Sequence, residues 1–327
     1  MARRYRFSAV PTLLWLAALT LSPGAPAQGV GTWPDKPIRL IVPYPPAGPS
    51  DIVARAVIAK IGASYRQPIV LENRPGAGGN IGAAEVARTA PDGHTWLVAV
   101  DTTVTINPHV YPKLPFKVSD LVPVTTLSYF GQVLVCHPGV GVHTLAELVA
   151  RAKGGNMSYA SGGAGVPGHM TMELLLSKTG MQMQHIPYKG PAPAAQDVIG
   201  GQVPCGFLAG PTVLPQIKAG KLVALAVYGN ARSPLLPEVP TVSEAGYAGM
   251  DGTFSLVLFA PRGVPEPILA AFRKSVVDAL RSDELVNALK ASDQSPGGDT
   301  SAEVAASLAA RSRVWGEVAK RINLTME

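Results

Sequence analysis

Two short glycine-containing loops are the segments of this sequence best suited to hold a charged small molecule. They are Pro46-Ala47-Gly48-Pro49-Ser50-Asp51 and Ser161-Gly162-Gly163-Ala164-Gly165, and each joins an expected strand to the start of an expected helix. A helix start leaves backbone N–H groups without partners and carries a partial positive charge. Glycine lets a bound group approach the backbone closely. The loops therefore predict an anion site built from neutral groups.

Such a site needs no cationic side chain. Hydrogen bonds to a charged group contribute roughly 1.5–3 kcal/mol each. Four of them, less the cost of binding, reach the ~8 kcal/mol of a micromolar ligand. The alternative for either loop alone is an ordinary strand-to-helix turn. Because the two loops lie in separate halves of the chain, the pair favours binding.

A third glycine run, at residues 76–82, raises the alternative of a dinucleotide site. It reads GAGGNIG, it is expected to follow a strand and open a helix, and Asp101 lies about 20 residues further on. The pattern G-x-G-x-x-G, however, requires glycine where Ile81 stands. We therefore expect no nucleotide and no other cofactor.

Catalytic and metal-binding patterns are missing from the sequence. It contains no G-x-S-x-G, S-x-x-K or H-E-x-x-H motif, and its six histidines lack metal-ligand spacing. His169 is expected just inside a helix at the cleft, where a structural role and ligand contact are both open. Asp51 is able simply to complement the dipole of its own helix. We expect no catalytic residue and no metal.

The elements that must position these loops alternate between strands and helices. We expect strands at 38–42, 69–72, 95–100, 133–136, 158–160, 185–188, 203–207, 222–227 and 254–259. We expect helices at 52–61, 145–153, 167–179, 192–199, 267–280 and 302–322. One more helix is expected to follow the glycine run and to end at residue 87. This spacing predicts mainly parallel sheets covered by helices, in two α/β units, with the tail returning to the first.

The chain begins with a segment typical of an export signal. Three arginines among the first six residues precede an apolar run from about Val10 to Leu21, and Ala25-Pro26-Ala27 fits a cleavage site. We expect a signal peptide over residues 1–27, cleaved after Ala27. The alternative, a membrane anchor, is disfavoured because the run is shorter than the ~20 residues of a spanning helix.

Composition excludes several other classes of protein. The 327 residues are 47% hydrophobic and 15% charged, which predicts a folded protein of about two domains. Removing the three signal arginines lowers Lys+Arg from 28 to 25 against 22 acidic residues, so the net charge falls from +6 to +3. So small a balance predicts no nucleic-acid partner. Cys136 and Cys205 are open to two interpretations, buried free thiols or a bridge.

Further motifs follow in order along nearly the whole mature chain. They are WPDKPIRLIVP at 33–43, PPAGPSD at 45–51, ENRPGAGGNIG at 72–82, APDG at 90–93, INP at 106–108, YAS at 159–161, HIPYKG at 185–190, APA at 192–194, GGQV at 200–203 and LPEVPT at 236–241. In these motifs the chain resembles the Bug-type receptors. Those are the extracytoplasmic solute receptors of tripartite tricarboxylate transporters.

The resemblance implies a type II periplasmic-binding-protein fold, an α/β fold with two lobes, two crossing segments and a ligand cleft between the lobes. We expect one lobe over 28–129 and 250–327 and the other over 130–249. The implied ligand is a small carboxylate, such as a dicarboxylate, an amino acid or an aromatic acid. The implied partners are integral-membrane transporter subunits, and we expect a periplasmic monomer.

The resemblance also implies ligand contacts, carried over position by position. They are Tyr44, Ala47, Gly48, Ser50 and Asp51 in the first lobe, Ser161, Gly163, Gly165 and His169 in the second, and Thr102, Thr103 and Asn107 after the third strand. Two positions depart from the family pattern. Ala47 replaces a usual glycine, and Val166 stands where Ser or Thr is common. Both changes favour a partly apolar acid, such as an aromatic acid, over citrate.

Two other functions remain open at this level. One is a periplasmic hydrolase or lyase that uses Asp51 or His169, and the other is a ligand-sensing module. The expected mechanism of a receptor is hinge closure around the bound acid, followed by docking on the transporter.

Overall fold

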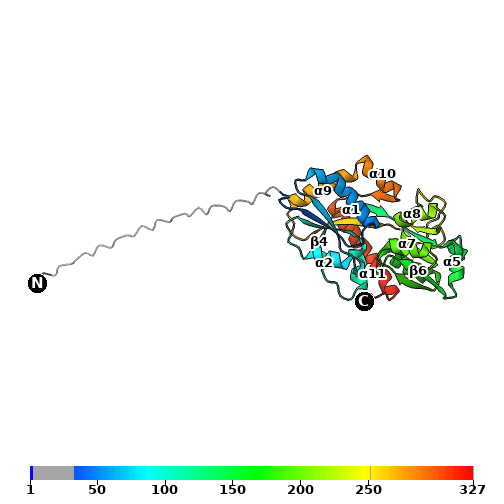
Figure 1. Cartoon of the computed structure of the whole chain (residues 1–327). Coiled ribbons are helices and arrows are strands. Elements are labelled where there is room, and N and C mark those ends of the chain that lie inside the picture. The colour runs from blue at the N-terminus through cyan, green and yellow to red at the C-terminus, as the bar shows by residue number, and fades with distance from the viewer. Residues whose placement is uncertain (3–32, 251, 327) are drawn as a thin grey trace. The chain divides into compact units, whose positions relative to one another are not determined.

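A computed structural model of the chain describes residues 1–2, 33–250 and 252–326. The predicted signal peptide, apart from its first two residues, lies outside this part of the chain. From Trp33 onward the described chain forms two α/β lobes (Figure 1). Among the helices of the described ranges, none combines the length and the apolar character needed to cross a bilayer.

The first lobe is built on a six-stranded sheet with the order β11-β4-β10-β3-β1-β2. Its strands are β1 (Ile38–Val42), β2 (Ile69–Asn73), β3 (Thr95–Val100), β4 (Leu121–Phe130), β10 (Phe254–Pro261) and β11 (Gln294–Pro296). Strand β1 pairs in parallel with β2 and β3. Strand β10 runs antiparallel to β3 and β4, and β11 antiparallel to β4.

Helices cover both faces of this sheet. Successive side chains of a strand point to opposite faces, so each strand contributes to a core on either side. Leu40 and Val98 belong to one core cluster with α1 (Pro49–Ile61) and α9 (Glu266–Leu280). Ile41 and Leu97 belong to another with α2 (Asn80–Ala87) and the start of α11 (Ser301–Arg321). Figure 1 shows α1, α9 and α10 (Asp283–Ala291) on the side opposite α2. Two short helices, α3 (Thr102–Thr105) and α4 (Asn107–Val110), follow β3.

The second lobe is built on a five-stranded sheet with the order β7-β6-β8-β5-β9. Its strands are β5 (Gln132–Cys136), β6 (Met157–Ser161), β7 (Met183–Pro187), β8 (Cys205–Ala209) and β9 (Val223–Tyr228). Its helices are α5 (Leu145–Ala152), α6 (Pro167–Thr179), α7 (Pro191–Ile199) and α8 (Gly210–Lys218). Strand β6 pairs in parallel with β7 and β8, whereas β5 is antiparallel to β8 and β9.

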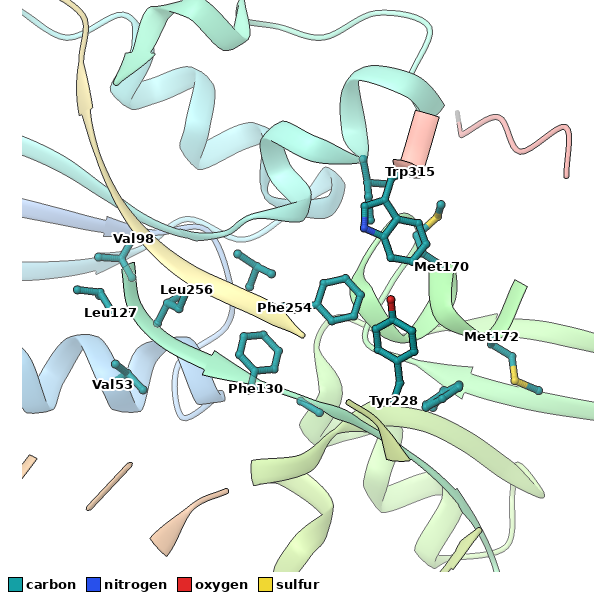
Figure 2. Packing of buried hydrophobic residues seen from close by; sticks show 14 of the residues in the cluster. Val53, Val98, Leu127, Phe130, Met170, Met172, Tyr228, Phe254, Leu256 and Trp315 are labelled. Carbon is teal, nitrogen blue, oxygen red and sulfur yellow. The ribbon is translucent and has the colours of Figure 1, made fainter. Parts of the chain in front are cut away.

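The chain crosses between the lobes twice, and an aromatic cluster packs at the crossings. The first crossing is at Gly131, between β4 and β5, and the second lies within residues 229–253, between β9 and β10. Phe254 at the start of β10 contacts Phe130, Tyr228 and Trp315, with ring centroids 6.4, 5.7 and 5.8 Å away (Figure 2). The ends of the crossing strands are therefore held together by apolar packing.

The expected α/β order is confirmed, but the expectation of mainly parallel sheets is wrong. Each sheet joins parallel pairs to antiparallel ones, because β10 and β11 run against the other strands of the first sheet and β5 runs against the other strands of the second. Strand β4 was not expected, since Pro123 and several hydroxyl side chains interrupt its apolar pattern. Helices α8 and α10 and strand β11 were also missed.

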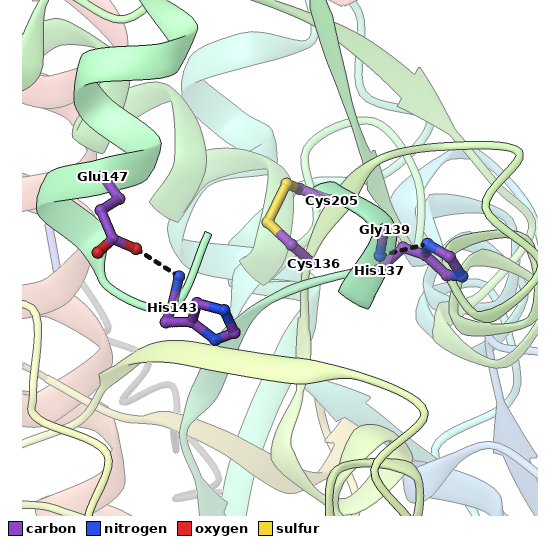
Figure 3. Close-up of a disulfide and its surroundings, with 6 residues drawn as sticks. All are labelled: Cys136, His137, Gly139, His143, Glu147 and Cys205. Carbon is purple, nitrogen blue, oxygen red and sulfur yellow. Dashed lines mark hydrogen bonds between the residues drawn. A yellow bond between two sulfur atoms is a disulfide. The ribbon is translucent and has the colours of Figure 1, made fainter. Parts of the chain in front are cut away.

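The two cysteines form a disulfide between Cys136 of β5 and Cys205 of β8 (Figure 3). These residues face each other in the antiparallel register of the two strands, and both are fully buried. The interpretation as two free thiols is therefore wrong. Sequence alone did not decide it, because the pairing depends on the register of two strands whose cysteines lie 69 residues apart.

Candidate functional site

A cleft between the two lobes has a cavity volume of about 680 Å³, within the usual range for a small-molecule site. Residues 43–46, 48–50 and 75–79 line it from the first lobe, and residues 162–164, 166–168 and 187–193 from the second. Phe130 and Gln132, at the first crossing, also line it. Apart from a few polar groups the lining is apolar, and Lys189 is its one charged residue among the described residues.

Three helices point their N-termini at this cleft: α1 from the first lobe, and α6 and α7 from the second. Each has proline at its first position, namely Pro49, Pro167 and Pro191, and all three prolines line the cleft. Proline there wastes no N–H donor. Within the described residues, no side chain caps any of these three helices. Their remaining first-turn N–H groups are thus free to bind an anion.

The first-lobe loop is held in shape by Asp51, whose side chain is only 4% exposed. Its carboxylate accepts hydrogen bonds from the Ala47 N–H (3.0 Å), from Asn73 Nδ2 (3.0 Å) and from Arg55 Nε (2.9 Å). Burial alone would raise the pKa of Asp51, but these hydrogen bonds and the charge of Arg55 outweigh it and hold the pKa below its usual value. Asp51 therefore supports the loop from behind, and it does not line the cleft.

Of the predicted first-lobe contacts, Tyr44, Gly48 and Ser50 line the cleft, whereas Ala47 does not. The Tyr44 hydroxyl accepts a hydrogen bond from the Val100 N–H and lies 3.3 Å from Thr103 Oγ1. Burial raises the pKa of Tyr44 to about 12, because its effect is larger than the opposing effect of the hydrogen bonds. The hydroxyl therefore stays neutral.

Thr102, Thr103 and Asn107 are buried beneath the cleft surface and do not line it. Asn107 donates from Nδ2 to the Gly78 carbonyl (3.1 Å) and to Asn80 Oδ1 (2.7 Å). This fixes the glycine loop at residues 76–79, which does line the cleft. The run once considered for a dinucleotide is therefore part of the cleft wall.

In the second lobe, Gly163 lines the cleft, while Ser161, Gly165 and His169 lie behind the loop. The Ser161 hydroxyl donates to the Gly163 carbonyl (2.8 Å), and the Gly165 N–H donates to His169 Nδ1 (3.1 Å). The cleft surface is made instead by their neighbours Gly162, Ala164, Val166 and Gly168.

The segment 187–193 was missed as part of the site. It leaves β7 and enters α7 through Gly190 and Pro191, and it brings Tyr188 and Lys189 to the cleft. A signal for it was present: Gly190-Pro191 repeats the glycine–proline entry of Gly48-Pro49. Phe130, Gln132 and Phe207 were missed for a different reason, since they belong to β4, β5 and β8 and reach the cleft only through the tertiary fold.

The lobes approach each other closely at two points along the cleft. A Cβ atom on Gly78 would lie 3.3 Å from the Ala164 carbonyl oxygen. A Cβ atom on Gly190 would lie 3.4 Å from Pro45 Cγ. Backbone of one lobe thus meets backbone or proline of the other.

Ala47 offers a stability test of the first-lobe loop. Its φ of 62° lies in the left-handed region, which costs a non-glycine residue roughly 1–2 kcal/mol. We expect Ala47→Gly to stabilise the protein by about 1 kcal/mol in urea unfolding, after the entropy gained by the unfolded chain is subtracted. The control is Ala59→Gly, an exposed site inside α1, which should destabilise by about 0.5–1 kcal/mol. Equal losses from both changes would contradict the argument.

Two α/β lobes, two crossings and a cleft faced by helix N-termini from both lobes define a periplasmic solute-binding protein. Comparison with solved structures agrees. "R. palustris Rpa4515 with adipate" is 30% identical, with a TM-score of 0.86, over 90% of this chain and 99% of that one. "MatC (Rpa3494) from Rhodopseudomonas palustris with bound malate" is 29% identical, with a TM-score of 0.83, over 88% and 99%.

Sequence comparison is more specific. The profile of the family described as "Tripartite tricarboxylate transporter family receptor" matches residues 53–324. Protein BugT of Bordetella pertussis is 36% identical over 269 residues, which are 81% of this chain and 82% of BugT. The chain belongs to the tripartite tricarboxylate transporter receptor family.

Proposed function

We propose that this protein is a periplasmic receptor that captures a small carboxylate and presents it to the membrane subunits of a tripartite transporter. The observation that carries this proposal is the pair of uncapped helix N-termini, of α1 and α6, which face one cleft from opposite lobes. The malate and adipate held by the two similar structures belong to the same chemical class. We further propose export with cleavage after Ala27, a monomeric state, and lobes with the limits 28–129 and 250–327, and 130–249.

In this proposal the ligand is gripped by main-chain donors. The direct contacts are the backbone around Gly48 and Ser50 in the first lobe and around Gly163 and Gly168 in the second, with the neutral Tyr44 beside them. The other predicted residues act one layer further back and hold these loops: Ala47, Asp51, Thr102, Thr103, Asn107, Ser161, Gly165 and His169. An acid that touches both lobes stabilises the arrangement in which they meet.

The same arrangement disfavours an enzyme that uses Asp51 or His169. The Asp51 carboxylate is occupied by three donor groups of its own lobe, and His169 accepts a hydrogen bond from its own loop. Neither side chain lines the cleft. We propose that the protein returns its ligand unchanged, which chromatography of each acid after prolonged incubation with the protein will check.

The binding test is a thermal-shift panel of malate, adipate, citrate and benzoate at pH 7.5, preceded by native mass spectrometry to detect acid retained from the host. A ligand present at 100 times its Kd stabilises the folded state by about 2.7 kcal/mol. We expect at least one acid of the panel to raise Tm by several degrees. Citrate as the one stabilising acid would contradict the preference for a partly apolar acid.

Val166, the N-cap of α6, provides a variant that blocks the site without harming the fold. Val166→Asp places a carboxylate that caps α6 itself and repels a bound acid. We expect its Tm without ligand to equal or exceed that of the wild type, and its ligand-induced shift to vanish. Val166→Asn, a neutral cap of the same shape, is the matched control and should retain part of the shift. An undiminished shift in Val166→Asp would place the ligand elsewhere.

A further inference from the structure

A chain of buried and half-buried polar side chains runs behind the second-lobe loop. Its members are Tyr159 on β6, His169 and Glu173 on α6, His185 on β7, and Ser161 at the end of β6. The two imidazole rings are stacked face to face, with centroids 3.8 Å apart and planes 10° apart. None of these side chains lines the cleft, so a role as direct ligand contacts does not account for them.

The hydrogen bonds of Ser161 fix where the proton of His185 sits. The Ser161 hydroxyl has a single hydrogen, which it donates to the Gly163 carbonyl (2.8 Å). His185 Nε2 lies 2.7 Å from the same hydroxyl oxygen. The Gly163 carbonyl can only accept whereas an imidazole Nε2 can donate, so both contacts are satisfied together when Ser161 donates to the carbonyl and His185 Nε2 donates to Ser161. Ser161 Oγ also accepts the Gly163 N–H (3.2 Å), so His185 holds the loop at Gly163 through Ser161.

The contacts of His169 fix its proton in the same way. The Gly165 N–H donates to His169 Nδ1 (3.1 Å), so Nδ1 carries no hydrogen. The hydrogen of the neutral ring is therefore on Nε2, which lies 3.8 Å from Glu173 Oε1. Glu173 in turn accepts a hydrogen bond from the Tyr159 hydroxyl (2.6 Å). His169 thus fixes Gly165, which sits between two residues of the cleft surface, Ala164 and Val166.

Both rings are held in their neutral form by their surroundings. Burial, and then the neighbouring His185, lowers the pKa of His169 to about 3, and burial lowers the pKa of His185 to about 4. The titratable groups that face the pair are Glu173 on α6 and Tyr159 on β6, whose ring stacks on His185. Burial raises the pKa of Glu173, so this carboxyl gives less support to a positive charge on His169.

We propose that His169 and His185 are positioning residues: two neutral imidazoles, each with its hydrogen on Nε2, that set the second-lobe loop in its ligand-binding shape. This inference rests on the proposed function only for its effect on affinity. A solvent-exposed histidine titrates near pH 6.5. Since the pKa of each ring lies well below that value, neither histidine changes its charge between pH 8 and pH 5.5, and neither adds a pH dependence to the affinity for a carboxylate in that range.

The first test needs no ligand. A long-range 1H–15N spectrum of the labelled full-length mature protein at pH 6 reports the charge and tautomer of each histidine, with His169 and His185 assigned by the loss of one signal set in each variant. We expect two neutral rings protonated at Nε2. A charged ring or an Nδ1–H tautomer at either position would overturn the proposal. This result stands whether or not any acid of the panel binds, so it separates this inference from the proposed function.

The second test exchanges the two amides between the two sites. In His169→Asn the amide oxygen replaces the Nδ1 acceptor, and in His185→Gln the amide nitrogen replaces the Nε2 donor, so we expect both variants to keep Kd within about threefold. The crossed changes, His169→Gln and His185→Asn, put the amide at the wrong distance and should weaken binding at least about tenfold. The probe is whichever acid of the panel gives the largest thermal shift.

A matched control is His143→Gln. His143 is exposed and lies just before α5, outside the elements that carry the second-lobe loop and its supporting side chains. It should leave Kd and its pH profile unchanged. A packing role alone would rank the variants by size, so that both asparagines or both glutamines behave alike. That ranking would overturn the proposal.

Discussion

Replacing Arg311 with methionine will lower the free energy of unfolding by about 3–5 kcal/mol, because it leaves a buried carboxylate without its cation. Arg311 Nη1, from α11, lies 2.5 Å from Asp101 Oδ2 and also donates to the Thr253 carbonyl. Asp101 is 1% exposed, and its other hydrogen bond to a side chain comes from Ser255 (3.1 Å). Burial already raises the pKa of Asp101 against the opposing charge of Arg311.

Urea unfolding of the purified protein measures this effect. Arg313→Met is the matched control, since Arg313 is exposed on the same helix, and it should change stability by less than about 0.5 kcal/mol. The double change Asp101→Asn with Arg311→Met should recover most of the loss, because no unpaired charge remains. If Arg311→Met and Arg313→Met behave alike, the ion pair does not stabilise the fold.

Removing the Cys136–Cys205 disulfide will cost about 4 kcal/mol. The bridge closes a loop with a sequence separation of 69, and the lost chain entropy of the unfolded state grows with loop length. Helices α5, α6 and α7 lie within this loop. The N-termini of α6 and α7, which face the cleft, therefore belong to the segment that the disulfide closes. We expect reduced wild type and the double variant Cys136→Ala with Cys205→Ala to show the same lowered urea midpoint.

The control for this prediction is the double variant in the presence of reductant, whose midpoint should not move further. A wild-type midpoint that is insensitive to reductant, in protein shown by mass spectrometry to be reduced, would contradict the prediction. Because both cysteines are fully buried, reduction is expected only after partial unfolding.

Much of the fold followed from local sequence patterns. The predicted limits of β1, β3 and α6 are those of the structure, because apolar runs flanked by proline and glycine define them. The limits of β8 were displaced by two residues, since VPCGF reads as a strand from Val203 whereas the ladder begins at Cys205. Strand direction was not accessible, because it depends on how distant segments pair.

The cleft could be predicted in outline and not in detail. Backbone donors at α1 and α6 follow from glycine and proline at a strand-to-helix junction. Which side chains of those loops turn toward the cleft does not follow. Asp51, Ser161 and His169 are polar and sit in the right loops, yet they point back into their own lobes to satisfy backbone groups.

The three proline-led helix entries have a consequence for how selectivity can evolve. In the proposed site the carboxyl group is bound by main-chain N–H groups, so replacing a side chain that lines the cleft leaves these donors in place. Wall residues such as Val166 present side chains to the cleft, and their replacement changes its shape and polarity. A lineage built on this plan can therefore drift from one acid to another while its hold on the acid group itself persists.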